Sequence, residues 1–221
     1  MKVKEAVGCL FAAVLFGGGG LALLAWIFGF FSHTGAPIDN FDQLVAGVDA
    51  AIASGKFAPD LNKPEAEYDE DGVSLHIGDM ARRFLEGKPP LPINSQMDPP
   101  RPLPKPVKMV DFDRKRIDAI DDSLPDALRA PSLDAAATIV FVHCSPKKIG
   151  NYGLFADGFS RICNELFVER SGPSGMRILG IAFFEKSPPA KIDPRFHFGD
   201  IVADRPESDL KEFIERWSTA Q

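Results

Sequence analysis

The longest apolar stretch of the chain runs from residue 8 to residue 31 without a charged or strongly polar side chain. A helix rises about 1.5 Å per residue, so this stretch is long enough to cross the ~30 Å hydrocarbon layer of a membrane. Lys2 and Lys4 precede it, and no further Lys or Arg follows until Lys56. Because basic residues favour the cytoplasmic side, we expect a single transmembrane helix over 8–31 in the cell inner membrane. Residues 1–7 would then be cytoplasmic and the rest of the chain extracytoplasmic.

A cleaved signal peptide is the alternative for the same stretch. Its apolar core is usually about 7–15 residues and ends at a pair of small residues, whereas the run here is longer and the following FFSHTGAPID offers no good pair. This favours an uncleaved anchor that contacts the lipid bilayer. Small residues four apart, Gly18 with Ala22 and Ala25 with Gly29, let two helices approach closely. They indicate either a homodimer through this face or simply the glycine content that is common in membrane helices.

Apolar residues recur at helical spacing in two places between residues 32 and 88. The first helix is predicted over 40–54, where Asn40 can cap the start and Gly55 can end it. A second, weaker helix is predicted over 79–86. We therefore expect residues 32–88 to form a helical stem.

Prolines dominate the next segment, residues 89–106, which holds eight of them. Proline removes backbone donors and fixes φ, so this segment should be extended and semi-rigid. It is predicted to be a linker or a strap along the domain surface. The alternative is a ligand for a proline-recognising module, because PPRPLPKP satisfies PxxP.

The remaining residues, 107–221, predict a compact C-terminal α+β domain. TIVFVHC (138–144) is apolar on both faces, as expected of a central strand, and the final helix places four apolar side chains on one face. We therefore expect an α+β fold: an N-terminal transmembrane helix, a helical and proline-rich stem, and a small antiparallel three-stranded sheet packed by helices. The predicted elements are a helix over 112–121, strands over 138–144, 159–170 and 176–185, and a helix over 207–217.

This C-terminal region resembles a recurring, uncharacterised family of bacterial membrane-anchored envelope domains. The resemblance covers about 117–217 and is carried by LPDALRA (124–130), TIVFV (138–142), IGNYGLFADGFSRIC (149–163), Pro188–Pro189 and the closing helix. The family pattern is an LRA-type turn, a TVV-type strand, a G-x-Y step followed by Asp-Gly and an aromatic residue, and a later Pro-Pro. The resemblance implies the fold and carries over no activity and no catalytic residue.

Two cysteines of the domain are candidates for a disulfide. If the strands around 138–145 and 158–168 form a hairpin, Cys144 and Cys163 lie nearly opposite each other, with Cβ atoms about 4.5–5.5 Å apart. A modest adjustment would close the bond, and outside the cytoplasm it would persist and stabilise the domain by about 2–4 kcal/mol. The alternative is two independent buried thiols that behave as small apolar residues.

Other candidate chemistry is weaker. His143 and Cys144 cannot form a dyad with each other, because neighbours on a strand project to opposite faces. The segment DPRFHFGD gathers Asp193, His197 and Asp200, which could hold a cation, although polar loops are common for trivial reasons. The sequence therefore predicts no cofactor and no catalytic residue.

The net charge of the chain restricts the classes of partner that it can bind. The chain has 25 Lys and Arg against 31 Asp and Glu, a formal net charge of −6, which argues against nucleic acid as a partner. We expect a single-pass, membrane-anchored protein with an acidic extracytoplasmic interaction or structural domain and an envelope protein as its partner. The alternatives are a protein that binds a small ligand or a cation, and an envelope enzyme that uses the 186–206 loop.

Overall fold

The computed structural model gives the fold of one compact unit, residues 36–221. None of the helices in the described part of the chain is both long and apolar enough to span a membrane. The predicted transmembrane segment, residues 8–31, lies outside the described residues. The structure describes residues 35–62, 67–68, 74–88, 99, 102–151, 156–172, 175–189 and 199–219.

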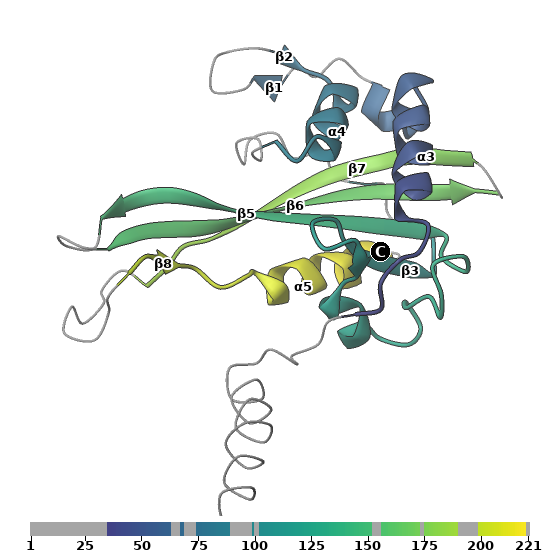
Figure 1. The fold of residues 1–221 in the computed structure, drawn as a ribbon. Coiled ribbons are helices and arrows are strands. Elements are labelled where there is room, and N and C mark those ends of the chain that lie inside the picture. Colours follow the sequence, from purple (N-terminus) through teal and green to yellow (C-terminus); the bar gives the residue numbers. More distant parts are fainter. Residues whose placement is uncertain are drawn as a thin grey trace, which may run out of the picture. The chain divides into compact units, whose positions relative to one another are not determined.

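Six strands form one mixed sheet, ordered β4-β3-β5-β6-β7, with β8 paired to β6 (Figure 1). β3 lies parallel to β5 and β8 lies parallel to β6, while the other pairs are antiparallel. A separate antiparallel pair consists of β1 (Glu67–Tyr68) and β2 (Ser74–Leu75). The strands of the main sheet are β3 (Val107–Asp111), β4 (Arg116–Ile117), β5 (Thr138–Asn151), β6 (Asp157–Ser171), β7 (Gly175–Lys186) and β8 (Ile201–Val202).

This sheet corrects the predicted fold class. The three predicted strands correspond to β5, β6 and β7, which form an antiparallel meander, but the sheet is mixed and has twice as many strands. β3 was not predicted, because its five residues, VKMVD, are a short segment between the prolines and the predicted helix over 112–121. β4 and β8 have two residues each, too few to produce a periodic pattern.

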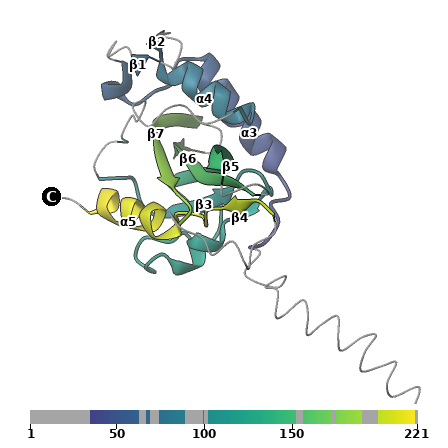
Figure 2. The ribbon, with the colours of Figure 1, turned by 90° about the vertical axis from the view of Figure 1, so that its left-hand side faces the viewer.

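Three helices cover the sheet, and they are α3 (Phe41–Ala53), α4 (Ile77–Leu85) and α5 (Glu207–Ser218). They confirm the helices predicted over 40–54, 79–86 and the C-terminal end. α3 and α4 lie over one face and α5 over the other (Figures 1 and 2). Because an amphipathic helix is stable only when its apolar face is covered, α3 and α4 belong to the sheet domain. The predicted separate stem is therefore wrong.

The predicted helix over 112–121 is also wrong. The chain turns after β3, with Lys115 at φ 53°, forms β4, and then enters a short 3₁₀ helix, Ala119–Ser123. The buried carboxylate of Asp118 caps that helix by accepting a hydrogen bond from the backbone N–H of Ile120 at 2.9 Å. A spacing of three between apolar residues suits a 3₁₀ helix as well as an α-helix, so the pattern of this segment was ambiguous.

Alternate residues of the long strands supply two separate cores. In β5, Ile139 and Phe141 face α3 and α4, whereas Val140 and Val142 face α5. The described end of the proline-rich segment packs on the second core, where Leu103 is buried and its N–H donates to the carbonyl of Trp217 at 2.8 Å.

Beyond the end of β3, the outer edge of β5 is protected by side chains. Cys144 faces Cys163 across the β5–β6 pair with 4.1 Å between their Cα atoms, the spacing of a non-hydrogen-bonded pair. The N–H of Cys144 therefore points outward, where the Asp113 carboxylate accepts it at 3.2 Å. Two residues on, Pro146 has no N–H to offer. These features leave the edge poorly suited to pairing with another strand.

Candidate functional site

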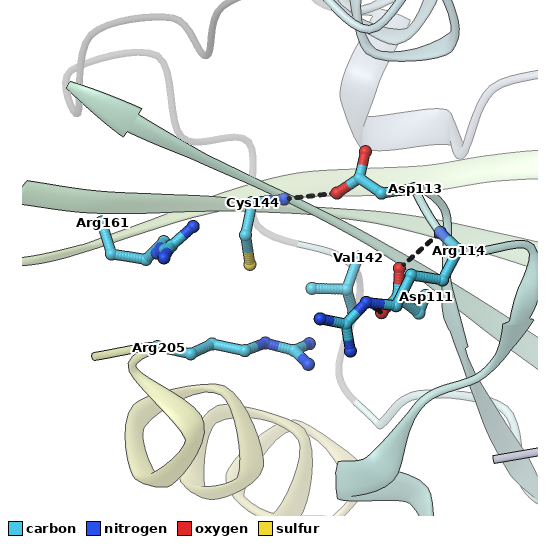
Figure 3. A pocket seen from close by; sticks show the side chains of 7 residues that line it. All are labelled: Asp111, Asp113, Arg114, Val142, Cys144, Arg161 and Arg205. Atoms are coloured by element: carbon cyan, nitrogen blue, oxygen red, sulfur yellow. Dashed lines mark hydrogen bonds and ion pairs between the residues drawn. The ribbon is translucent and has the colours of Figure 1, made fainter. Parts of the chain in front are cut away.

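A polar cleft of about 190 Å³ opens on the α5 face of the sheet, where β5 extends past the end of β3 (Figure 3). Three of its lining residues come from the end of β3 and the following turn, two from β5, one from β6 and one from the segment before α5. These residues are Asp111, Asp113, Arg114, Val142, Cys144, Arg161 and Arg205. Three guanidinium groups and two carboxyl groups thus meet around one small space.

The β3–β4 turn holds the two acidic residues in place. Asp111 accepts the backbone N–H of Arg114 at 2.9 Å, and burial raises the pKa of its carboxyl group while the Arg114 hydrogen bond lowers it. Asp113 bridges the two sides of β5: one carboxylate oxygen contacts Nδ1 of His143, and the other accepts the N–H of Cys144. Both carboxyl groups therefore already have partners within the protein.

Arg205 is fixed by a buried acid. Its two terminal nitrogens donate to the two oxygens of Asp118, an ion pair in which the Asp118 side chain is 0% exposed and that of Arg205 21% exposed. This two-pronged geometry holds the guanidinium plane rigidly. The Nε of Arg205 is buried and has no hydrogen-bond partner among the described residues.

Arg161 is different because no acidic partner is found for it in the described part of the chain. It lies on β6, is partly buried, and has a buried Nε that lacks a hydrogen-bond acceptor there. Arg114, by contrast, is mostly exposed and lies 3.8 Å from Asp111. Arg161 is therefore the uncompensated positive charge of the cleft, in a chain whose formal net charge is −6.

Glu165 lies on the same face of β6, four residues from Arg161. It is fully buried, and neither carboxyl oxygen has a hydrogen-bond partner among the described residues. Burial raises its pKa well above the usual range and nearby Asp118 raises it further, while Arg205 acts in the opposite direction. Neither oxygen of Glu165 bonds to Arg161, so Glu165 is not the ion-pair partner of that guanidinium.

Between Arg161 and Glu165 on that face lies Cys163, and the structure joins it to Cys144 in a disulfide. Cys163 is completely buried, whereas Cys144 is only partly buried and lines the cleft. Figure 3 shows the sulfur of Cys144 directed into the space between Arg161 and Arg205. The disulfide is thus a wall of the cleft as well as a link between strands.

The other sequence candidates are not gathered at this site. His143 packs against Phe84 and Phe112, on the opposite face of the sheet from Cys144, as alternation along a strand predicts. Asp200 is exposed and accepts the backbone N–H of Asp157 at 3.2 Å. Asp193 and His197 lie outside the described residues. No group of three or more His, Cys, Asp or Glu that could hold a metal is found in the part of the chain that the structure describes.

The arginines of the cleft were not predicted from the sequence, although one signal for them was present. The strand FSRICNELFVER carries Arg161, Cys163 and Glu165 at alternate positions, and alternation places all three on one face. Charged residues on a face that is otherwise apolar indicate a local opening in the core. No comparable signal pointed to Arg205, which approaches this face only because β8 returns alongside β6.

Comparison with known proteins gives no match: no family model, no curated protein and no solved structure matches the chain. The resemblance to bacterial envelope domains therefore stays a prediction, and the function is inferred from the cleft alone.

Proposed function

We propose that the domain is a binding module for a small anionic ligand, which places a carboxylate or phosphate group in the cleft beside Arg161. The observation that carries this proposal is the uncompensated guanidinium of Arg161, whose buried Nε has no acceptor among the described residues. A buried donor without a partner costs about 1–3 kcal/mol. An oxyanion in the cleft would remove this cost and neutralise the charge.

The neighbouring arginines support the same ligand class. The Nε of Arg205 is a second buried donor that has no acceptor in the described structure, and Arg205 is held in position by Asp118. Guanidinium groups bind carboxylates and phosphates through parallel hydrogen bonds. A water molecule occupies about 30 Å³ in the liquid, so a cleft of about 190 Å³ has room for a group of several non-hydrogen atoms.

Thermal unfolding in the presence of anions tests this proposal. The melting temperature should rise with inorganic phosphate or with succinate, compared with chloride at the same ionic strength, because a ligand that binds only the folded state stabilises it. Phosphate and succinate in separate titrations distinguish the two sources of oxyanion.

Two variants make the test specific. Arg161→Met should abolish the rise in melting temperature, whereas Arg82→Met should keep it, because Arg82 is an exposed arginine of α4 that pairs only loosely with Asp79. Equal responses to phosphate, succinate and chloride in the unmodified protein would contradict the proposal.

The cellular setting in the proposal comes from the sequence. An anchor over residues 8–31 would hold the domain outside the cytoplasm, where a disulfide persists. Labelling of intact cells with a membrane-impermeant maleimide tests this in a Cys9→Ser background. Labelling should appear only after treatment with an impermeant reductant. Labelling that requires lysis and no reductant would instead place the domain in the cytoplasm.

A further inference from the structure

The Cys144–Cys163 disulfide lines the same cleft for which we propose anion binding. We propose that Cys144 is a site of thiol–disulfide exchange with small, carboxylate- or sulfonate-bearing thiols, which the arginines of the cleft select by charge. This inference rests on the proposed anion site and names a class of ligand that reacts there.

Accessibility decides which sulfur is attacked. Cys163 is completely buried and does not line the cleft, whereas Cys144 does. Figure 3 shows the sulfur of Cys144 directed into the cleft, so a thiolate that enters should meet this sulfur first. The attack should give a mixed disulfide on Cys144 alone.

Charge decides which thiols react. Arg161 and Cys163 lie two positions apart on one face of β6, and Cys144 is directly opposite Cys163. A positive charge next to a disulfide attracts an anionic attacking thiol and stabilises the thiolate that leaves. Asp111 and Asp113 also face this space but already accept hydrogen bonds from the protein, and Arg205 is paired with Asp118. Arg161 is therefore the residue that provides the selection.

The reaction consists of two successive thiol–disulfide exchanges. The thiolate sulfur of the small thiol forms a bond to the sulfur of Cys144, and the bond between Cys144 and Cys163 breaks. The electron pair of that bond leaves with Cys163, whose thiolate then takes a proton from solvent. A second molecule of the same thiol attacks the mixed disulfide, so that two small thiols are oxidised to their disulfide and both cysteines are reduced.

Three thiols of similar size test the charge selection on the full chain in detergent with a Cys9→Ser background. They are 2-mercaptoethanesulfonate (anionic), 2-mercaptoethanol (neutral) and cysteamine (cationic). The rate at which each thiol reduces the protein disulfide is divided by the concentration of its thiolate, which corrects for differences in thiol pKa. It is then divided by the rate of the same thiol with bis(2-hydroxyethyl) disulfide, which corrects for differences in intrinsic nucleophilicity. We expect the anionic thiol to react about tenfold faster than the neutral one and the cationic thiol to react slowest.

Variants and salt identify the cause of the selection. Arg161→Met and Arg161→Gln should remove it, Arg161→Lys should retain most of it, and Arg82→Met should leave it unchanged. In the unmodified protein the selection should weaken as salt screens the arginines, a test that does not depend on whether a variant folds. Acid quenching, alkylation and peptide mass measurement should find the adduct on Cys144.

The opposite outcomes are equally clear. Equal corrected rates for the three thiols, a preference that salt does not change, or an adduct on Cys163 would overturn the inference. Phosphate binding at the cleft without charge selection would leave the proposed function standing and refute the exchange site alone.

Discussion

The two faces of the sheet are formed by the same three long strands, β5, β6 and β7, but they carry different side chains. On one face, α3 and α4 together cover a core that includes Phe84 and Phe141. On the other face a single helix, α5, covers the half near Phe167, and the other half carries arginines and carboxyl groups around the cleft. The composition of each face thus follows the extent of its helical cover.

This contrast places the proposed anion site in the part of the sheet that no helix covers. Apolar side chains on β6 occur where α5 lies above them, and Arg161 occurs where α5 has not yet begun. Exposed or half-exposed charges there cost little to solvate, whereas the same residues under α3 or α4 would be strongly unfavourable. The predictions below test this division, from the largest expected effect to the smallest.

The largest effect is expected for the covered face. Phe84→Ala removes a buried ring that contacts Phe112 at 5.1 Å between centroids, so it should lower the free energy of unfolding by about 4 kcal/mol. Urea unfolding measures this change. Ile149→Ala, at an exposed position of β5, is the control and should change stability by less than about 0.5 kcal/mol. Similar losses in both variants would refute the comparison.

A smaller loss is expected at the boundary of the cleft. Arg205→Met leaves the buried Asp118 with its hydrogen bond from Ile120 but without a cation, which should cost about 3 kcal/mol. The exposed pair of Lys211 and Glu215 on α5 is the matched control, and Lys211→Met should cost less than about 1 kcal/mol. If the two losses in urea unfolding are equal, the buried ion pair does not hold the cleft together.

Replacement of Glu165 should raise the free energy of unfolding, in contrast to the two substitutions above, and the gain should depend on pH. Burial raises the pKa of Glu165 in the folded chain, whereas in the unfolded chain it ionises near its ordinary pKa of about 4.3, so between these two pKa values the folded chain binds more protons. Folding above that pH therefore takes up a proton, and the stability of the unmodified protein falls as pH rises toward the raised pKa.

Glu165→Gln removes this proton uptake. The variant should be more stable than the unmodified protein at pH 7.5, and the difference should shrink as the pH is lowered to about 4.5. Urea unfolding at the two pH values checks it. A gain that is the same at both would mean that Glu165 is not protonated on folding.

The smallest change in stability is expected for Arg161→Met. Arg161 makes no ion pair with a described residue, and its buried Nε has no acceptor there, so its removal should not destabilise the protein and should raise the free energy of unfolding by about 1 kcal/mol. The same substitution should abolish the stabilisation by phosphate. A loss of several kcal/mol in urea unfolding without anion would show that Arg161 has a structural role.

The sequence predicts the parts of the fold that have long periodic patterns and misses the parts assembled by pairing. The helix ESDLKEFIERW and the strand TIVFVHC each place apolar residues at the spacing of their element, and both are present. β4 and β8 form because neighbouring strands provide hydrogen-bond partners for them. A strand of two residues is too short to show a periodic pattern in the sequence. The cleft was unpredictable for the same reason, since Arg161 and Arg205 meet only through the pairing of β8 with β6.

The most direct test of the central claim is an NMR spectrum of the arginine Nε–Hε groups in the ¹⁵N-labelled full chain, recorded with and without inorganic phosphate. Arg161→Lys and Arg205→Lys assign the two signals by their loss. We expect phosphate to shift the signals of Arg161 and Arg205, while that of Arg82 stays in place and chloride at equal ionic strength shifts none of them. Unchanged Arg161 and Arg205 signals at saturating phosphate and, in a second titration, at saturating succinate would show that the cleft binds neither oxyanion and would contradict the account.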